Sequence, residues 1–96
     1  MADTAKAIAD ATRRALIEEL HARKGRSLFD LCVALLGRDF AASRQAVSKH
    51  IAVLEEAELV TIRKVGRTNI HHLDTTRLGE VIAWLVEHTA SLQEER

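Results

Sequence analysis

The chain has 96 residues, of which 47% are apolar and 29% are charged. That length suits one domain with a modest core, and the composition is typical of a folded globular protein rather than a disordered segment. No apolar run approaches the ~18 residues that cross a bilayer. The single cysteine excludes an internal disulfide and any zinc site made of several cysteines. We therefore expect one cytoplasmic domain over residues 1–96 that has no membrane partner.

Charge is balanced over the whole chain but not along it. Of the 14 basic and 14 acidic side chains, residues 41–70 hold five basic and three acidic ones, whereas residues 71–96 hold two and five. The middle of the chain is therefore mildly basic, and its end is acidic. Three aromatic residues are too few for a platform that stacks single-stranded nucleic acid. The sequence contains no glycine-rich phosphate loop, zinc-protease motif or nucleophile–base pair, so it does not indicate an enzyme.

Helix-start signals divide the first half of the chain into four helices. Asp10, Ser27 and Ser43 each precede a helical pattern and carry a side-chain oxygen that can cap a helix N-terminus. Gly25 and Gly37 mark the ends of the second and third helices. Apolar positions at helical spacing predict the core. They are Leu16, Ile17 and Leu20, then Leu28, Leu31, Cys32, Leu35 and Leu36, then Val47, Ile51 and Leu54.

The pattern changes to β-structure after the fourth helix. Residues 59–63 and 69–73 favour strands, and residues 64–68 between them form a short loop that contains Gly66. Asp74 or Thr75 then caps a last helix. The expected order is helix, helix, helix, helix, strand, strand, helix. This is a mainly α fold with a small β-hairpin, in the layout of a winged helix-turn-helix.

The fourth helix places four polar side chains opposite its apolar positions. A helix fits the major groove of duplex DNA, where its polar face reads base edges. Arg44 can donate two hydrogen bonds to a guanine, and Gln45 can pair with an adenine. Ser48 suits a base or a phosphate, and Lys49 suits a phosphate. The spacing alone is equally compatible with a solvated helix surface.

The predicted hairpin adds a second basic feature. Arg63, Lys64 and Arg67 lie within five residues that contain no acid. A wing of this kind can press onto a phosphate backbone or into a minor groove. A basic turn that only favours solubility is the alternative. Because both features occur in the right order, we interpret the helix from Ser43 and the wing at 63–69 as DNA-binding.

The segment SRQAVSKHIAVLEEAELV at 43–60 resembles the recognition-helix signature of ArsR-type winged-helix repressors. The resemblance covers about residues 5–90, with supporting segments at 9–14, 63–67 and 71–74. It implies a homodimeric transcriptional regulator, usually a repressor, that binds a palindromic operator in double-stranded DNA. It also implies that His50 belongs to the DNA-facing set, together with Arg44, Gln45, Ser48 and Lys49.

Two departures from the family pattern concern the arrangement of the helices. Ala11 stands where the family usually has proline, so we expect a less sharp break between the first two helices. Residues 37–42 form a longer turn than the usual three or four residues, which leaves the tilt of the recognition helix open. Within this turn, Phe40 is expected to cover the edge of the core.

The last helix is too apolar for one small core to cover it. Residues 81–86 are all apolar, and Leu78, Ile82 and Leu85 form one stripe while Val81 and Trp84 point elsewhere. A helix that is apolar on most sides needs cover on two of them. We therefore expect a homodimer, although the first helix or the long turn could supply the cover instead. The predicted interface comprises Ile8, Leu78, Val81, Ile82, Trp84 and Leu85.

Metal sensing, which occurs in this family, has little support in the sequence. Cys32 lies on an apolar stripe, where a small core residue is the simpler interpretation. His71 and His72 are adjacent strand residues that point to opposite faces, which disfavours a cluster with Asp74. We expect no metal, cofactor or catalytic residue, and no inducer is identified. The alternatives are a winged-helix module that binds proteins instead of specific DNA and, with less support, a metal-responsive repressor.

Overall fold

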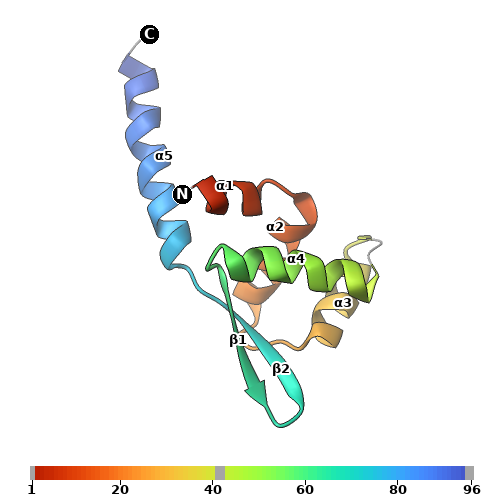
Figure 1. The fold of residues 1–96 in the computed structure, drawn as a ribbon. Coiled ribbons are helices and arrows are strands. Elements are labelled where there is room, and N and C mark those ends of the chain that lie inside the picture. Colours follow the sequence, from red (N-terminus) through yellow and green to blue (C-terminus); the bar gives the residue numbers. More distant parts are fainter. Residues whose placement is uncertain (1, 41–42, 95–96) are drawn as a thin grey trace.

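The helices and strands follow one another in the expected order. The structure is a computed structural model that describes residues 2–40 and 43–94. Its helices are α1 (Ala2–Ile8), α2 (Ala11–Ala22), α3 (Leu28–Gly37), α4 (Arg44–Glu56) and α5 (Thr76–Glu94), and its strands are β1 (Val60–Val65) and β2 (Thr68–Leu73). Figure 1 shows α4 crossing the body of the protein, with the hairpin below it and α5 at the opposite end. The predicted mainly α fold with one β-hairpin is confirmed.

Three helices begin directly after the residues predicted to cap them. The side-chain oxygens of Asp10, Ser27 and Ser43 each accept a bond from the backbone N–H three residues later, at 3.0–3.1 Å. Such bonds satisfy N–H groups that have no partner within the helix. The expected weak break at Ala11 is not found, because Asp10 has an extended backbone (φ −96°, ψ 133°) and separates α1 from α2 without a proline.

The core lies between α2, α3, α4 and the start of the hairpin. Its largest fully buried side chains are Leu16, Leu20, Leu31, Leu35, Val47, Leu54, Leu59 and Val60. Cys32 and Phe40 pack against this cluster, as the sequence predicts. Leu36 does not: it is 63% exposed and lies on the outer side of α3 with Phe29 and Val33. The predicted apolar stripe of α3 is wider than the one face that the neighbouring helices cover.

The hairpin is longer and its turn is tighter than predicted. The antiparallel register runs from Val60 opposite Leu73 to Val65 opposite Thr68, so Lys64 and Val65 belong to β1 rather than to a loop. The turn contains only Gly66 and one further residue, and Gly66 has a positive φ of 62°. A two-residue hairpin turn needs such a left-handed conformation, which glycine adopts at little cost.

A one-residue β-bridge anchors the base of the wing to the loop between α2 and α3. The backbone N–H of Arg26 donates to the carbonyl of His71 at 3.1 Å, and the N–H of His71 donates back at 2.8 Å. The Nδ1 atom of His71 lies 2.9 Å from the same Arg26 carbonyl. Both residues are buried, so this bridge fixes where the hairpin leaves the helical body.

The charge of the buried Arg26 is paired inside the fold. Its guanidinium donates to Glu19 Oε1 at 2.7 Å, and Arg38 donates to the other carboxylate oxygen at 3.3 Å. The bond from Arg26 lowers the pKa of Glu19 below its ordinary value of 4.5, against the opposing effect of burial. The Arg38 charge lowers this pKa further. The network joins α2 to the loop before α3 and to the residue that follows α3.

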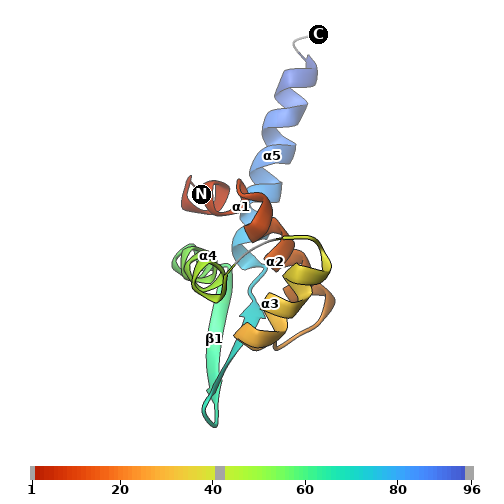
Figure 2. The same ribbon diagram turned by 90° about the vertical axis from the view of Figure 1, so that its right-hand side faces the viewer.

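Among the described side chains of α5, which run from Thr76 to His88, those in the first turns pack against the rest of the chain. Leu78 contacts the core cluster and Val81 is buried, whereas Ile82, Trp84 and Leu85 are 60%, 44% and 48% exposed. Figure 2 shows α5 extending past α1 and away from the body. Of the stripe formed by Leu78, Ile82 and Leu85, only Leu78 packs against the core of the protomer, and Val81 from the neighbouring side of the helix is buried as well. None of the described helices is long and apolar enough to span a bilayer.

Candidate nucleic-acid interface

The outer side of α4 presents polar side chains at the surface of the protein. Arg44, Gln45, Ser48 and Lys49 are all exposed, whereas the apolar positions on the other side of the helix are buried. Ser43 caps the first turn, which fixes where this side begins. The structure thus brings four of the predicted DNA-facing residues onto one accessible surface, with the two cationic side chains in its first half.

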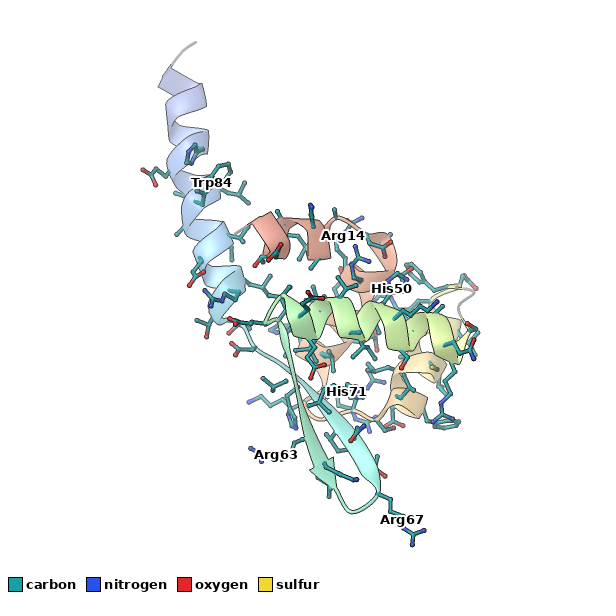
Figure 3. All side chains as sticks on the ribbon, in the orientation of Figure 1. Arg14, His50, Arg63, Arg67, His71 and Trp84 are labelled. Atoms are coloured by element: carbon teal, nitrogen blue, oxygen red, sulfur yellow. The ribbon has the colours of Figure 1, made fainter. Side chains whose placement is uncertain are left out.

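His50 lies apart from these four residues. Its side chain is 25% exposed, and its Nδ1 atom is 3.2 Å from a terminal nitrogen of Arg13 and 3.9 Å from Asp10 Oδ1. Figure 3 places His50 beside the corner between α1 and α2, on the side of α4 away from the wing. The family resemblance includes His50 in the DNA-facing set, but in this structure its polar contacts are made within the protein.

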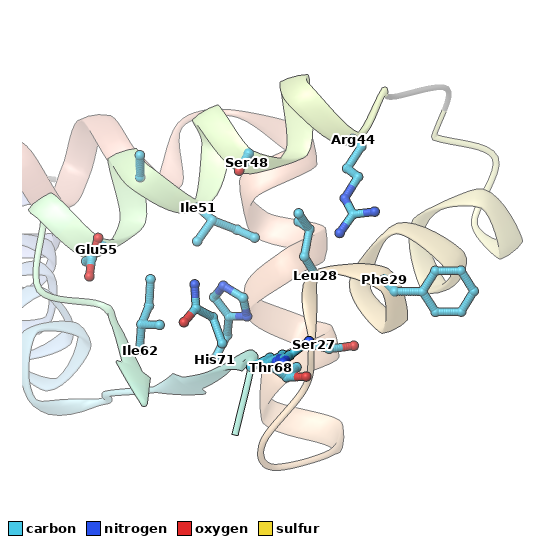
Figure 4. A pocket seen from close by; sticks show the side chains of 13 residues that line it. Ser27, Leu28, Phe29, Arg44, Ser48, Ile51, Glu55, Ile62, Thr68 and His71 are labelled. Atoms are coloured by element: carbon cyan, nitrogen blue, oxygen red, sulfur yellow. The ribbon is translucent and has the colours of Figure 1, made fainter. Parts of the chain in front are cut away.

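A groove of about 560 Å³ separates α4 from the wing and the start of α3. Its apolar floor includes Ile51 from α4 and Ile62 from β1, which point toward each other in Figure 4. Polar side chains from all three elements line its edges, namely Ser27, Arg44, Ser48, Glu55, Arg67, Thr68 and Asn69. Glu55 places a carboxylate in the groove at the C-terminal end of α4. The cationic side chains that line the groove therefore lie at the start of α4 and at the wing tip.

The wing divides its basic side chains between two faces. Alternate strand residues point to opposite faces, and directly paired residues share one face. Lys64 pairs with Asn69, which lines the groove, so Lys64 lies on the groove side. Arg63 pairs with Ile70 and lies on the other side. Arg67 lines the groove at the wing tip, where Figure 3 shows it pointing outward.

The cationic side chains of α4 and the wing have no internal partner, unlike most other arginines of the protein. Among the side chains that the structure describes, no hydrogen bond or ion pair involves Arg44, Lys49, Arg63, Lys64 or Arg67. In contrast, six arginines elsewhere bind carbonyls or carboxylates: Arg13, Arg14, Arg23, Arg26, Arg38 and Arg77. Unpaired exposed cations attract an external polyanion, and nothing within the described fold competes for them.

Sequence reasoning missed part of the groove. Ser27, Thr68 and Asn69 line it, but they belong to separate segments that only tertiary packing brings together. The cap signal identified Ser27 as a helix start, without indicating that α3 begins beside the wing. For possible metal ligands, no group of three or more His, Cys, Asp or Glu side chains lies together within the described residues.

Comparisons with known proteins agree with this geometry. A family model described as a helix-turn-helix domain matches residues 8–63. The HTH-type transcriptional regulator YuzN of Bacillus subtilis (strain 168) is 39% identical over 83 residues, covering 85% of this chain and 90% of the relative. The transcriptional repressor SdpR of the same organism is 31% identical over 81 residues, covering 84% and 83%.

Solved structures give the same result. An ArsR-like transcriptional regulator from Rhodococcus sp. RHA1 matches with a TM-score of 0.81 and 28% identity, over 98% of this chain and 81% of the other. A homodimeric winged helix-turn-helix DNA-binding domain from Mycobacterium bovis shares the fold, with a TM-score of 0.69 and 18% identity over 99% and 82%. The chain therefore belongs to the ArsR-type family of winged helix-turn-helix transcriptional regulators, which are DNA-binding proteins.

Proposed function

We propose that the protein is a homodimeric repressor that binds an inverted-repeat operator through α4 and the wing. The observation that carries this proposal is the set of exposed, internally unpaired cations on both sides of one groove. DNA carries a regular array of phosphates, and neutralising them releases counterions and stabilises the complex. The repressor role is supported by the relative SdpR, which is named a transcriptional repressor.

In this proposal, α4 enters the major groove and reads base edges from its first two turns. Arg44 donates two hydrogen bonds to O6 and N7 of a guanine, and Gln45 pairs with N6 and N7 of an adenine. Ser48 and Lys49 contact phosphates or an adjacent base and hold the helix in register. Base contacts by Arg44 and Gln45 then determine which sequence is bound, whereas the phosphate contacts contribute mainly affinity.

The wing contacts the sugar–phosphate backbone beside the major groove. Lys64 and Arg67 are assigned the phosphate contacts because they lie on the groove side of the hairpin. Arg63 faces the opposite side and contributes at most longer-range attraction. The free tip of the hairpin extends away from α5, which suits a contact at the outer edge of each half-site (Figure 1).

The dimer forms through α5 and α1. Ile82, Trp84 and Leu85 are exposed on α5 and form the surface available to a partner, whereas Val81 is buried and Ile8 of α1 packs against the core of the protomer. An exposed apolar surface of this kind marks an interaction site. A two-fold axis through this end of the molecule would place two copies of α4 about one DNA turn apart, roughly 34 Å. The Mycobacterium bovis domain, which shares the fold, is described as homodimeric.

The proposal is tested by selecting bound sequences from random duplex DNA at near-physiological salt. We expect the protein to enrich an inverted repeat, and the Arg44/Gln45/Lys49→Ala variant to enrich none. Circular dichroism and sedimentation verify that the variant remains folded and has the same mass as the parent. If the folded parent enriches no motif, or if the variant enriches the same one, the proposal is wrong.

A further inference from the structure

Arg13 belongs to α2 and lies where α1, α2 and α4 meet. Its side chain forms hydrogen bonds with both α1 and α4. Its Nε donates to the carbonyl of Ala7 at 2.7 Å, and one terminal nitrogen donates to the carbonyl of Lys6 at 3.1 Å. Its other terminal nitrogen is 3.2 Å from Nδ1 of His50 on α4. One rigid, planar guanidinium therefore connects the end of α1 to the recognition helix.

The contacts of Arg13 with α1 are to carbonyls at its C-terminal end, of which that of Lys6 also accepts from the backbone N–H of Ala9 at 3.2 Å. The last carbonyls of any α-helix have no partner within it. Arg13 binds those of Lys6 and Ala7, and Arg14 binds the next one, that of Ile8, at 2.9 Å. The end of α1 is thus tied to α2 by two neighbouring arginines. No hydrogen bond or ion pair joins Arg14 to α4 among the described residues, so of the two arginines Arg13 alone extends the hydrogen-bonded connection to the recognition helix.

The chemistry of His50 shows which atom donates. Arginine has donors only, so Nδ1 of His50 accepts the bond and the proton of the neutral ring is on Nε2. Asp10 Oδ1 lies 3.9 Å from the same Nδ1, too far for a hydrogen bond, and accepts instead from the backbone N–H of Arg13 at 3.0 Å. His50 is therefore held by Arg13, and Asp10 fixes the backbone of Arg13 at the start of α2.

We propose that Arg13 and His50 form a positioning link that fixes α4 relative to α1. This inference rests on the proposed function, in which α1 belongs to the dimer interface and α4 reads DNA. The link then sets the separation and angle of the two recognition helices, and with them the half-site spacing that the dimer accepts. His50 acts as a positioning residue through this bond and does not contact a base.

The test measures spacing preference, which a loss of stability alone would not change. Affinity is measured for the selected inverted repeat and for the same repeat with two base pairs inserted at its centre, which separates the half-sites by about 7 Å more. The parent should strongly prefer the original spacing. In Arg13→Gln and in His50→Leu, the ratio of the two affinities should fall by about tenfold, because the charged hydrogen bond is lost.

Two variants serve as matched controls. Arg14→Gln loses a comparable bond to α1 but no hydrogen bond to α4, so it should keep the spacing ratio of the parent. His50→Asn places an amide oxygen close to the position of Nδ1 and should also keep the ratio. His50→Leu leaves the bonds of Arg13 to α1 in place, so it carries the test if Arg13→Gln does not fold.

Each outcome decides between distinct conclusions. If the parent prefers one spacing and His50→Leu retains that preference, the positioning link is refuted while the proposed function stands. If Arg13→Gln and His50→Leu lose affinity equally at both spacings, the ratio of the two affinities is unchanged. Arg13 and His50 then contribute only to folding, and the positioning link is refuted as well. If the parent binds no inverted repeat at all, the proposed function is wrong and the inference fails with it.

Discussion

The wing offers a pair of adjacent cations whose contributions to DNA binding should differ. Lys64 and Arg63 carry the same charge and are neighbours in β1, but they lie on opposite faces of the hairpin. Each phosphate contact makes the logarithm of affinity fall with the logarithm of salt concentration by about 0.9. In a dimer, Lys64→Ala removes one contact from each protomer and should flatten this slope by about 1.8. Arg67→Ala should have the same effect.

Arg63→Ala is the matched control, because it removes an equal charge from the other face. A single phosphate contact contributes about 0.9 to the slope, and Arg63→Ala should change the slope by much less than that. The slopes are measured by fluorescence anisotropy on the selected operator between about 50 and 200 mM salt. If Arg63→Ala and Lys64→Ala flatten the slope equally, the wing acts through its total charge. The assignment of its groove side to the DNA backbone would then be wrong.

Three further predictions concern stability and assembly. Glu19→Ala leaves the buried Arg26 without its carboxylate and should lower the free energy of unfolding by about 3 kcal/mol in urea titrations at neutral pH. Because the folded state lowers the pKa of Glu19, its contribution is present above the ordinary value of 4.5 and lost as the pH falls through the folded value. The difference from the parent should therefore narrow as the pH falls below 4.5, and a constant difference would contradict the ion pair. In Gly66→Ala the new Cβ meets no atom within 4 Å, but the residue keeps a φ of 62°, which is unfavourable for a residue with a side chain. Thermal unfolding should therefore show that the free energy of unfolding falls by about 1 kcal/mol. An unchanged free energy would show that the turn can change its conformation. Ile82→Glu should convert a dimer to monomers in sedimentation velocity, whereas Leu36→Glu, at an equally exposed apolar position on α3, should not; dissociation by both would point to a different interface.

Local features of the fold could be predicted from the sequence because they depend on neighbouring residues. The caps at Asp10, Ser27 and Ser43 need only one side chain and a backbone N–H three residues away. The buried positions of α4 follow from helical periodicity in the same way. Periodicity alone predicted the Leu36 position wrongly, since it cannot indicate how much of a stripe the neighbouring elements cover.

Features that join distant segments were not predictable in this way. The bridge between Arg26 and His71 joins residues 45 positions apart and involves a single residue on one side, so no strand pattern marks it. The bond between Arg13 and His50 spans 37 positions. The sequence places His50 near the border of the polar side of α4, and only packing against the α1–α2 corner turns its ring toward Arg13. The exposed polar side of α4 was thus predictable, whereas the contacts that orient α4 were not.

In the proposed function, two copies of α4 read the two halves of one operator. The most direct measurement is the mass of the complex with the selected duplex, determined by sedimentation at near-physiological salt. Two protomers should bind one duplex that contains both half-sites, and changing either half-site should weaken binding of the pair. A complex with one protomer per duplex, or affinity that is unchanged when one half-site is scrambled, would contradict the claim.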